Sequence, residues 1–318
     1  VHTSTFRSML HFGRGVFGAD FGTVSFVIQK KKIKNYECVY RRLYKKQGAV
    51  DSVEQKQAWF FDGTGRFVAD QDNFTVIPGV PIAYWLGETA RRAFNTGISI
   101  DTISDFTGSQ HKTADNDRFL RYWWGLNDED IRCKDWIFYI KGGEYRKWYG
   151  NIELVVDWRE SARDFYISNP TSNMIKETYW FKEGITYTSL TSSVNGFRYL
   201  PPIGVFDIKG PSLINVQHLN YCLGFFNSSV AMMYLKLLNP TITLQVKDVK
   251  NTPIIYEPER ECEISSMVQE NISASKDDWD SFETSWDFER HPLVRHTARI
   301  SEAFSQWERE CANRFNLL

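Results

Sequence analysis

One stretch of the sequence, residues 141–151, combines the residue types that could hold a polyanion. It reads K-G-G-E-Y-R-K-W-Y-G-N. Gly142 and Gly143 permit positive φ angles and a close backbone approach. Arg146 and Lys147 add charge, and three aromatic rings add flat apolar faces. This mixture on a tight turn suits a phosphate backbone and its bases. It also fits an ordinary exposed turn between two strands, with its aromatic rings in the core.

The elements around this stretch are predicted to be strands. The β-rich runs 137–140 and 152–158 flank it, so residues 141–151 are predicted to be a long hairpin connection. A second polar stretch, T-S-S-V-N-G-F-R-Y at 191–199, follows a strand-like run at 179–190.

The remaining pattern predicts an α+β fold. Strands are expected at 23–29 (half-buried by its alternation), 36–43, 58–61, 74–77, 98–108 and 241–246, with 30–34 as the loop between the first two if they pair. Helices are expected at 81–97, 216–226, 229–238 and a C-terminal segment with apolar residues at 300, 304, 307, 311 and 315. The Trp123-Trp124 pair is interpreted as core rather than as a contact surface.

Composition excludes several classes of protein. The 318 residues carry 42% hydrophobic and 24% charged residues, 11 Trp and a net charge of −1, which is typical of a globular protein with room for one or two cores. Residues 1–50 are strongly basic and the chain beyond residue 252 is acidic, which fits a nucleic-acid-facing side or solubility alone. The overall pI of about 6.7 argues against a general polyanion binder, so any nucleic-acid contact must be local. Five scattered cysteines, no secretory signal and no apolar run of about 20 residues predict a cytoplasmic location and no membrane contact.

Common catalytic motifs are missing from the sequence. It has no G-x-x-x-x-G-K-[ST] and no H-E-x-x-H. The glycines of G-R-G-V-F-G at 13–18 have dinucleotide spacing, but a strand rather than a helix follows them. The histidines do not cluster at ligand spacing, and Asp277, Asp278 and Asp280 lack a following E-x-K. We therefore expect no metal site and no restriction-type cleavage centre in this chain.

Six motifs occur in one order along the chain: T-A-D-N-D-R-F-L-R-Y-W-W, K-G-G-E-Y-R-K-W-Y-G-N, Y-W-F-K-E-G-I-T-Y-T-S-L-T-S-S, F-R-Y-L-P-P-I-G-V-F-D, L-N-P-T-I-T-L-Q-V-K-D-V and D-W-D-S-F-E-T-S-W-D-F-E-R-H-P-L. With them, nearly the whole chain resembles the C-terminal half of PglX-like adenine-specific DNA methyltransferases of BREX phage-defence systems and related type IIG restriction–modification enzymes. One departure is G-S-Q-H-K-T-A-D-N in place of the expected G-x-Q-T-G-D-N.

The resemblance implies a division of labour along the chain. Such enzymes bind S-adenosylmethionine in a Rossmann-like domain with an [NDS]-P-P-[YF] motif, which holds the flipped adenine. Here the one Pro-Pro, Pro201-Pro202, follows Tyr199-Leu200. We therefore assign no catalytic residue and no cofactor, and expect the chain to be inactive without a separate methyltransferase domain. Residues 1–50 are interpreted as the terminal strands of that domain, 51–256 as a target recognition domain, and 257–318 as a helical segment.

The resemblance also implies sequence-specific binding of double-stranded DNA. We expect phosphate contacts from cations, base contacts from the second polar stretch, and turns formed by Gly142, Gly143 and Gly196. The cations are Lys112, Arg118, Lys141, Arg146 and Lys147, and the base-contacting residues are Ser192, Ser193, Asn195 and Arg198. For Arg198 a surface salt bridge is an equal alternative. The alternative function is a protein-interaction module that docks other defence-system proteins.

Overall fold

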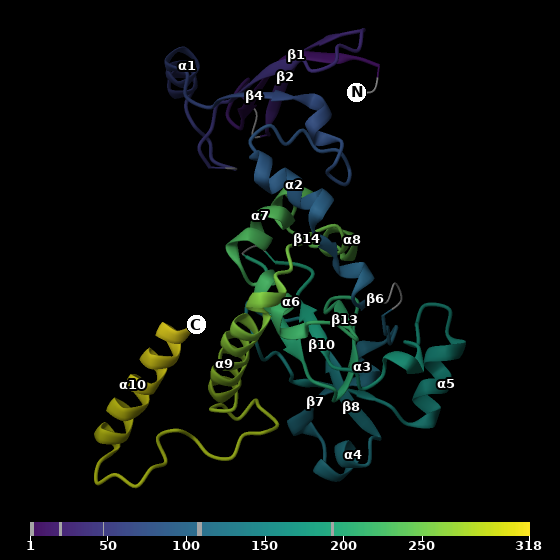
Figure 1. The fold of residues 1–318 in the computed structure, drawn as a ribbon. Helices are drawn as coiled ribbons and strands as arrows, with labels where there is room; N and C mark the ends of the chain where they lie inside the picture. The colour runs from purple at the N-terminus through teal and green to yellow at the C-terminus, as the bar shows by residue number, and fades with distance from the viewer. Residues whose placement is uncertain (1–2, 19–20, 47, 107–109, 192–193) are drawn as a thin grey trace. The chain divides into compact units, whose positions relative to one another are not determined.

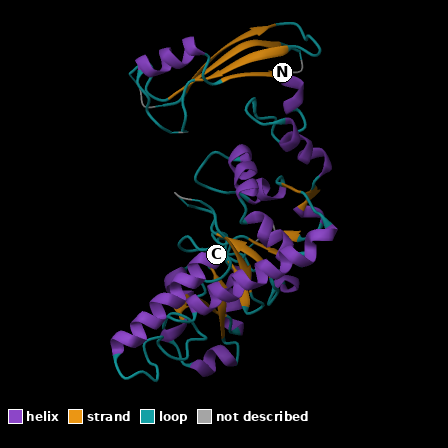
Figure 2. Ribbon diagram, turned by 60° about the vertical axis from the view of Figure 1, so that its left-hand side comes forward, coloured by secondary structure: helices purple, strands orange, loops and turns teal. Residues whose placement is uncertain are grey.

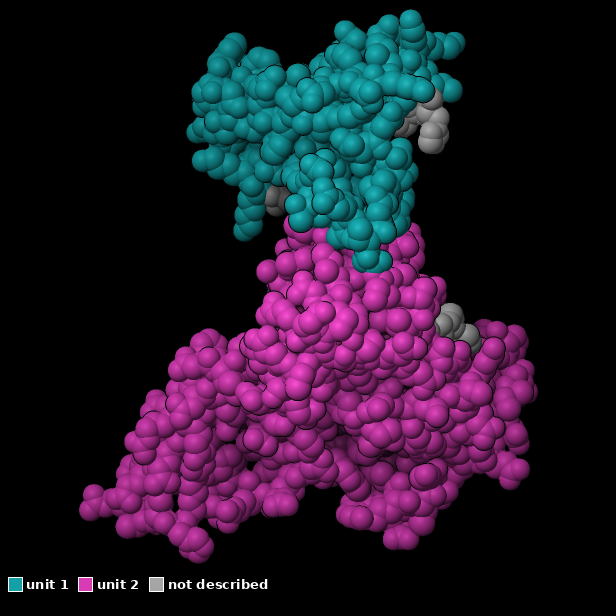
Figure 3. Space-filling view, in the orientation of Figure 1, with its two compact units in different colours: residues 1–97 teal, residues 98–318 magenta. Residues whose placement is uncertain are grey.

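The computed structural model describes residues 3–18, 21–46, 48–106, 110–191 and 194–318. The chain forms two compact units, residues 1–97 and 98–318 (Figure 3). Both contain helices and strands, so the fold is α+β, as the sequence predicted. The units do not follow the predicted division at residues 50 and 256, since one sheet pairs strands from both sides of residue 50. That division concerned the origin of each segment, and it stays a prediction.

The first unit is built on a four-stranded sheet with the order β2-β1-β3-β4 (Figure 1). Strand β1 (Thr5–Gly13) pairs antiparallel with β2 (Thr23–Gln29) and parallel with β3 (Glu37–Arg42). Strand β3 pairs antiparallel with β4 (Arg66–Asp70). The prediction of β2 and β3 as strands is correct, but residues 30–34 do not join paired neighbours, because β1 lies between them.

Strand β2 is more exposed than its alternation predicted. Val24, Phe26, Val27 and Ile28 are 46%, 52%, 57% and 46% exposed, so both faces are open. The strand lies at an edge of the sheet. An alternating pattern indicates a half-buried strand only where another layer covers one face, and within the first unit β2 has no such cover.

Two other predictions fail in the first unit. Residues 58–61, expected as a strand, form the second half of helix α1 (Val53–Asp62), which the Ser52 hydroxyl caps by accepting the Gln55 N–H at 3.2 Å. Residues 74–77, also expected as a strand, form the end of a 3-10 helix (Gln71–Phe74) and the turn after it. Helix α2 (Glu88–Thr96) ends before Gly97 as predicted, but begins seven residues after Pro81.

The second unit contains two four-stranded sheets and one two-stranded ladder. Their orders are β11-β10-β13-β6, β12-β8-β9-β7 and β14-β5. The strands are β5 (Ile98–Ser99), β6 (Asp105–Phe106), β7 (Leu120–Tyr122), β8 (Trp136–Ile140), β9 (Leu154–Asp157), β10 (Gly184–Tyr187), β11 (Phe197–Leu200), β12 (Gly204–Phe206), β13 (Ser212–Ile214) and β14 (Pro253–Ile254). Every residue of β8 is buried, because this strand is flanked by β12 and β9 and its side chains enter the core.

Helices surround these sheets (Figure 2). They are α3 (Asn116–Phe119), α4 (Asp128–Arg132), α5 (Glu160–Ser168), α6 (Leu219–Phe226), α7 (Ser229–Leu238), α8 (Val246–Lys250), α9 (Glu261–Trp279) and α10 (Ile300–Leu317). The sequence predicted α6, α7 and the acidic helical C-terminal segment, but missed α5. Residues 241–246, expected as a strand, instead lead into α8, whose start is stabilised by a reciprocal capping box between Gln245 and Asp248.

Candidate nucleic-acid interface

Residues 141–151 connect two antiparallel neighbours, β8 and β9, so the predicted hairpin is confirmed. We call this connection the glycine loop. Its backbone turns repeatedly through the left-handed region: φ is 91° at Gly142, 117° at Gly143 and 116° at Gly150. Trp148 and Asn151 also have positive φ. Glycine adopts this conformation without the steric cost of a Cβ atom, which explains the sharp turn after β8.

The glycine loop lies against β11, which contains the last three residues of the second polar stretch. The Trp148 N–H donates to the Phe197 carbonyl at 2.9 Å, and the Trp148 carbonyl accepts the Tyr199 N–H at 2.7 Å. A Cβ atom at Gly196 would lie 2.2 Å from the Arg146 carbonyl oxygen. Gly196 therefore permits a close backbone approach and, unlike Gly142 and Gly143, does not form a left-handed turn. The fold thus brings together the two stretches that the sequence singled out.

The rings of the glycine loop divide between core and surface. Trp148 and Tyr149 are each 7% exposed and belong to the core of the second unit, whereas Tyr145 is 52% exposed. Burial raises the pKa of the Tyr149 hydroxyl to about 12. Only Tyr145 of these three rings is therefore available to stack on a base.

The two cations of the glycine loop have different surroundings. The Arg146 guanidinium lies 4.9 Å from the centre of the Trp279 ring and 3.8 Å from a carboxylate oxygen of Asp278. The Lys147 Nζ donates to the Asn227 carbonyl at 3.1 Å, at the C-terminal end of α6. A cation there compensates the partial negative charge of the helix end. The contact gives Lys147 a structural role that the sequence did not predict.

A pocket of about 550 Å³ opens beside the glycine loop. Its polar lining includes three cations, Lys141, Arg146 and Lys209, and two carboxylates, Glu144 and Glu153. Within the described part of the chain, Lys141 and Lys209 have no ion-pair partner. Gly142 and Gly143 also line the pocket. Burial raises the pKa of Glu153, and the charge of Arg146 opposes this shift. Cations that line one pocket are the donors that an oxyanion needs.

Lys209 is a pocket residue that the sequence analysis missed. It follows β12 in a turn where the Asp207 carboxylate accepts the Lys209 N–H at 2.6 Å. The same carboxylate accepts the hydroxyl of Tyr139, another pocket residue, at 2.6 Å. A signal was present, because a lysine directly before Gly210-Pro211 and three residues after the end of β12 is typical of an exposed turn.

The other predicted phosphate-contacting cations lie outside this pocket's lining. Lys112 is exposed, and its N–H and carbonyl pair with the carbonyl and N–H of Asn173 at 2.9 Å. Arg118, in α3, is also exposed and stacks on Phe119 and Phe165, with its guanidinium carbon 4.6 Å and 5.0 Å from the ring centres. Both cations are accessible to a ligand, and their role stays a prediction.

The predicted base-contacting residues are only partly described. Ser192 and Ser193 lie outside the described residues. Asn195 is half-buried, and its side-chain amide donates to the Thr188 carbonyl at 3.4 Å. Asn195 therefore contacts its own scaffold here, and its predicted contact with a base would replace this long hydrogen bond.

Arg198 requires a correction. It was expected to present its guanidinium to a base or in a surface salt bridge, but its side chain is 1% exposed. Arg198 lies on β11 opposite Thr186 of β10, and its side chain points to a covered face and not to solvent. Burial, with a smaller contribution from the charge of Arg146, lowers the pKa of Arg198 to about 10. A buried, unpaired cation costs several kcal/mol, and periodicity in a polar stretch gives no indication of it.

The altered turn at 111–114 has an internal role. His111 is fully buried, with ring centres of Tyr166, Trp158 and Tyr139 at 4.6, 5.3 and 5.6 Å. Neither of its ring nitrogens has a hydrogen-bond partner within the described residues. Burial lowers the pKa of His111 to about 3, so the imidazole is neutral at physiological pH. The imidazole serves as an aromatic core residue.

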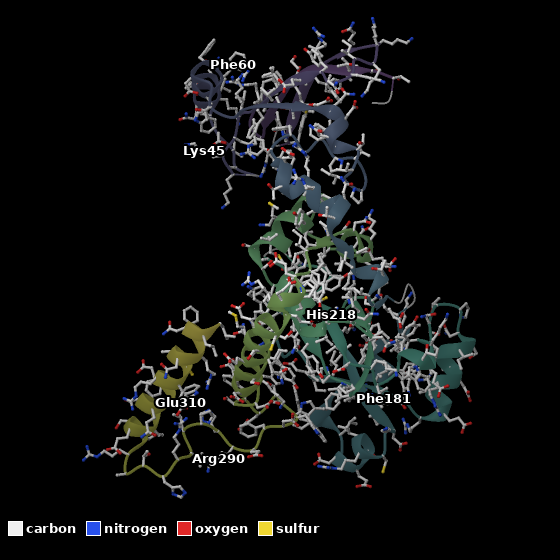
Figure 4. The ribbon with its side chains drawn as sticks, in the orientation of Figure 1. Lys45, Phe60, Phe181, His218, Arg290 and Glu310 are labelled. Atoms are coloured by element: carbon white, nitrogen blue, oxygen red, sulfur yellow. The ribbon has the colours of Figure 1, made fainter. Side chains whose placement is uncertain are left out.

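A second polar cluster lies at the start of α6. His218, labelled in Figure 4, has φ 55° and places Nδ1 2.6 Å from a carboxylate oxygen of Glu261. The other oxygen of that carboxylate accepts the Tyr256 hydroxyl. These two hydrogen bonds lower the pKa of Glu261, that from Tyr256 more strongly. The cluster ties the start of α6 to the start of α9, which is a structural function.

Two features are absent from the described residues. No group of His, Cys, Asp and Glu side chains in this part of the chain is arranged to hold a metal ion. No helix within the same residues is long and apolar enough to span a membrane.

Two known proteins that are similar to the chain are both named adenine-specific methyltransferases. No protein-family model matches it. It is 31% identical over 347 aligned positions, covering 98% of its length, to the adenine-specific methyltransferase PglX of Lacticaseibacillus casei (strain Zhang). It is 27% identical over 338 positions, covering 96% of its length, to the adenine-specific methyltransferase BrxX of Escherichia coli O9:H4 (strain HS). The chain spans only 28% and 26% of these two relatives.

A solved structure of the type IIL restriction–modification enzyme MmeI in complex with DNA is also similar, over 99% of this chain and 44% of that one. Its TM-score is 0.46 and its identity 9%, values too low to equate the two folds. The sequence similarity to the two methyltransferases does not depend on this structure. The resemblance to PglX-like adenine-specific methyltransferases that the sequence motifs indicated is thereby confirmed, for a region that makes up 26–28% of such a protein.

Proposed function

We propose that this chain is the target recognition region of an adenine-specific DNA methyltransferase and that it binds duplex DNA. In this proposal the glycine loop holds the phosphate backbone and the adjoining second polar stretch contributes sequence discrimination. Methyl transfer from S-adenosylmethionine belongs to residues outside this chain, because the chain has no [NDS]-P-P-[YF] motif. The setting is a phage-defence or restriction–modification system, as for the enzymes that the chain resembles.

The observation that supports this proposal most is the pocket beside the glycine loop. Lys141 and Lys209 face it without an ion-pair partner among the described residues. Phosphate contacts fix the register of a protein on DNA without reading its sequence. A recognition region needs such contacts as well as base contacts, because each base pair is read at a defined distance from the backbone.

The test is a titration of duplex DNA with the chain at several salt concentrations. Removing one phosphate-binding cation should reduce the slope of log K against log salt by about 0.9. Lys141→Gln and Lys209→Gln should each weaken binding to all sequences and reduce the slope by about this amount. Lys236→Gln removes an exposed cation from α7, away from the pocket, and should leave both quantities unchanged. Equal effects of all three substitutions would contradict the pocket's role.

The alternative function, a protein-interaction module, is favoured by one feature of α10. This helix exposes large apolar side chains, with Ile300 at 74%, Phe304 at 48% and Phe315 at 82%. Its Glu310, labelled in Figure 4, forms a bidentate pair with Arg295 at 2.6 Å. If the chain fails to bind duplex DNA even at low salt, docking of other defence-system proteins becomes the better proposal.

A further inference from the structure

Arg198 is a buried cation without a compensating anion. Its Nε and one terminal nitrogen have no hydrogen-bond partner among the described residues. The other terminal nitrogen makes only a long contact, 3.4 Å, to the Thr188 hydroxyl. No carboxylate of the described residues pairs with it. Arginine is always charged at neutral pH, so this arrangement lacks the partner that a buried guanidinium requires.

One residue, Thr188, connects Arg198 to the glycines that line the glycine-loop pocket. The Thr188 hydroxyl that Arg198 contacts donates to the Gly143 carbonyl at 3.1 Å. The Thr188 methyl group would be 3.3 Å from a Cβ atom at Gly142. Both glycines line the pocket. A contact chain of Arg198, Thr188 and the glycine turn therefore separates the buried guanidinium from the pocket.

The charge near this turn increases the need for an anion. Arg146 lines the pocket and is the neighbouring cation that acts on Arg198. Arg146 has a long ion pair with Asp278, at 3.8 Å, but no carboxylate of the described residues pairs with Arg198, so the two guanidinium groups still repel each other. A phosphate group bound between them would turn that repulsion into two attractions, and the planar guanidinium can donate two parallel hydrogen bonds to it.

The Gly142–Gly143 turn is held mainly by close packing and by a small number of hydrogen bonds. Few hydrogen bonds secure it: the Thr188 hydroxyl holds the Gly143 carbonyl, and the Asn151 side-chain amide holds the Glu144 carbonyl at 2.8 Å. Glycine tolerates a wide range of backbone angles, so a shift of the turn needs no side chain to be displaced at these positions.

We propose that Arg198 is the inner cation of a phosphate-binding site, which the Gly142–Gly143 turn covers in the free protein and uncovers when phosphate enters the pocket. The ligand class is a phosphate group, either in a nucleic-acid backbone or as a free anion. The inference rests on the proposed function only for the first of these sources.

The test uses the full chain and inorganic phosphate, compared with chloride at equal ionic strength. Phosphate should raise the Tm of the unmodified protein by at least about 2 °C. Arg198→Met should have an unchanged or higher Tm in chloride, because it removes an unpaired charge, and should lose the increase in phosphate. Arg309→Met, which removes an exposed arginine of α10 that does not line the pocket, should keep the increase. No phosphate effect on the unmodified protein, or an equal effect on Arg198→Met, overturns the inference.

A second measurement covers the case in which Arg198→Met does not fold. Phenylglyoxal modifies accessible arginines, and mass spectrometry locates the modified residues. Arg198 of the unmodified protein should react slowly, through opening of the turn, and phosphate should slow this reaction several-fold. The reaction of Arg309 should not change. A reaction of Arg198 that phosphate does not slow, or no reaction at all, contradicts the inference.

Duplex DNA separates this inference from the proposed function. If phosphate protects Arg198 but duplex DNA does not bind, the site takes free phosphate and the proposed function fails alone. If duplex DNA binds the unmodified protein and Arg198→Met equally, without any phosphate effect on Tm, the inference fails and the proposed function stands.

Discussion

The Lys147 ammonium lies 3.1 Å from the Asn227 carbonyl oxygen, and this contact joins the glycine loop to the end of α6. The Asn227 side chain extends the junction. Its oxygen accepts the Phe197 N–H at 3.0 Å and its amide donates to the Phe197 carbonyl at 2.9 Å. One asparagine thus holds a helix end, a strand and the loop in one arrangement.

Asn227→Ala should therefore be costly. It leaves a buried backbone N–H without an acceptor, and each orphaned group costs about 1–3 kcal/mol. We expect a loss of about 2–4 kcal/mol in the free energy of unfolding, measured by urea denaturation. Asn220→Ala, at a half-buried position of α6 with only a 3.4 Å side-chain contact, should change stability by less than about 0.5 kcal/mol.

Lys147→Met should reduce the stability of the chain more than its affinity for DNA. Because the ammonium is engaged with the end of α6, we expect the substitution to cost about 1 kcal/mol of stability. Its effect on DNA affinity should be smaller than that of Lys141→Gln. A larger effect on affinity than Lys141→Gln, at unchanged stability, would restore Lys147 to the phosphate contacts that the sequence predicted.

Gly196→Ala should destabilise the chain through a steric overlap. The added Cβ atom would lie 2.2 Å from the Arg146 carbonyl, a backbone atom that cannot rotate away. We expect a loss of about 2 kcal/mol or more in thermal or urea unfolding. Gly125→Ala is the matched control in the same unit, since a Cβ atom there has no neighbour within 4 Å. A small effect at residue 196 would mean that the loop is free to separate from β11.

The burial of His111 predicts a dependence of stability on acid. The pKa of the unfolded imidazole is about 6.5 and that of the folded one about 3. Between these values the unfolded state binds the extra proton, so stability falls as the pH decreases from about 6.5 towards 3. The slope from this residue is at most about 1.4 kcal/mol per pH unit.

His111→Phe should remove this contribution. As the pH falls from 7 to 4, the unfolding free energy of the unmodified protein, measured by urea titration, should decrease more than that of His111→Phe. His296→Gln, at an exposed position, should show no such change. Parallel pH profiles for His111→Phe and the unmodified chain would show that this imidazole is not held neutral.

The sequence predicted local features better than packing. The glycine loop, α6 and α7 were recognised because their signals, a Gly-Gly turn between two apolar runs and helical stripes ended by Asn239-Pro240, are local. The exposure of β2 and the burial of Arg198 were not, because each depends on which layer lies over a strand. Lys209 lines the pocket because of the turn after β12. It was not predicted as a pocket residue because it is far in sequence from the glycine loop.

The same limit explains the errors in element type. Residues 58–61 are aromatic and apolar, which favours a strand, yet Ser52 caps a helix that includes them. Residues 241–246 contain β-branched residues, but the Gln245–Asp248 capping box ends that segment in a helix. In both cases a polar side chain at the helix start outweighed the propensity of the residues around it.

The way in which the glycine loop is anchored has a consequence for how the chain can evolve. Its anchors, Trp148 and Lys147, act through buried backbone or helix-end contacts, whereas the side chains of Glu144 and Tyr145 at its tip are exposed. Mutations at the tip can therefore accumulate at little cost in stability, while the anchors keep the loop in register. A surface with this separation can acquire new binding preferences one substitution at a time.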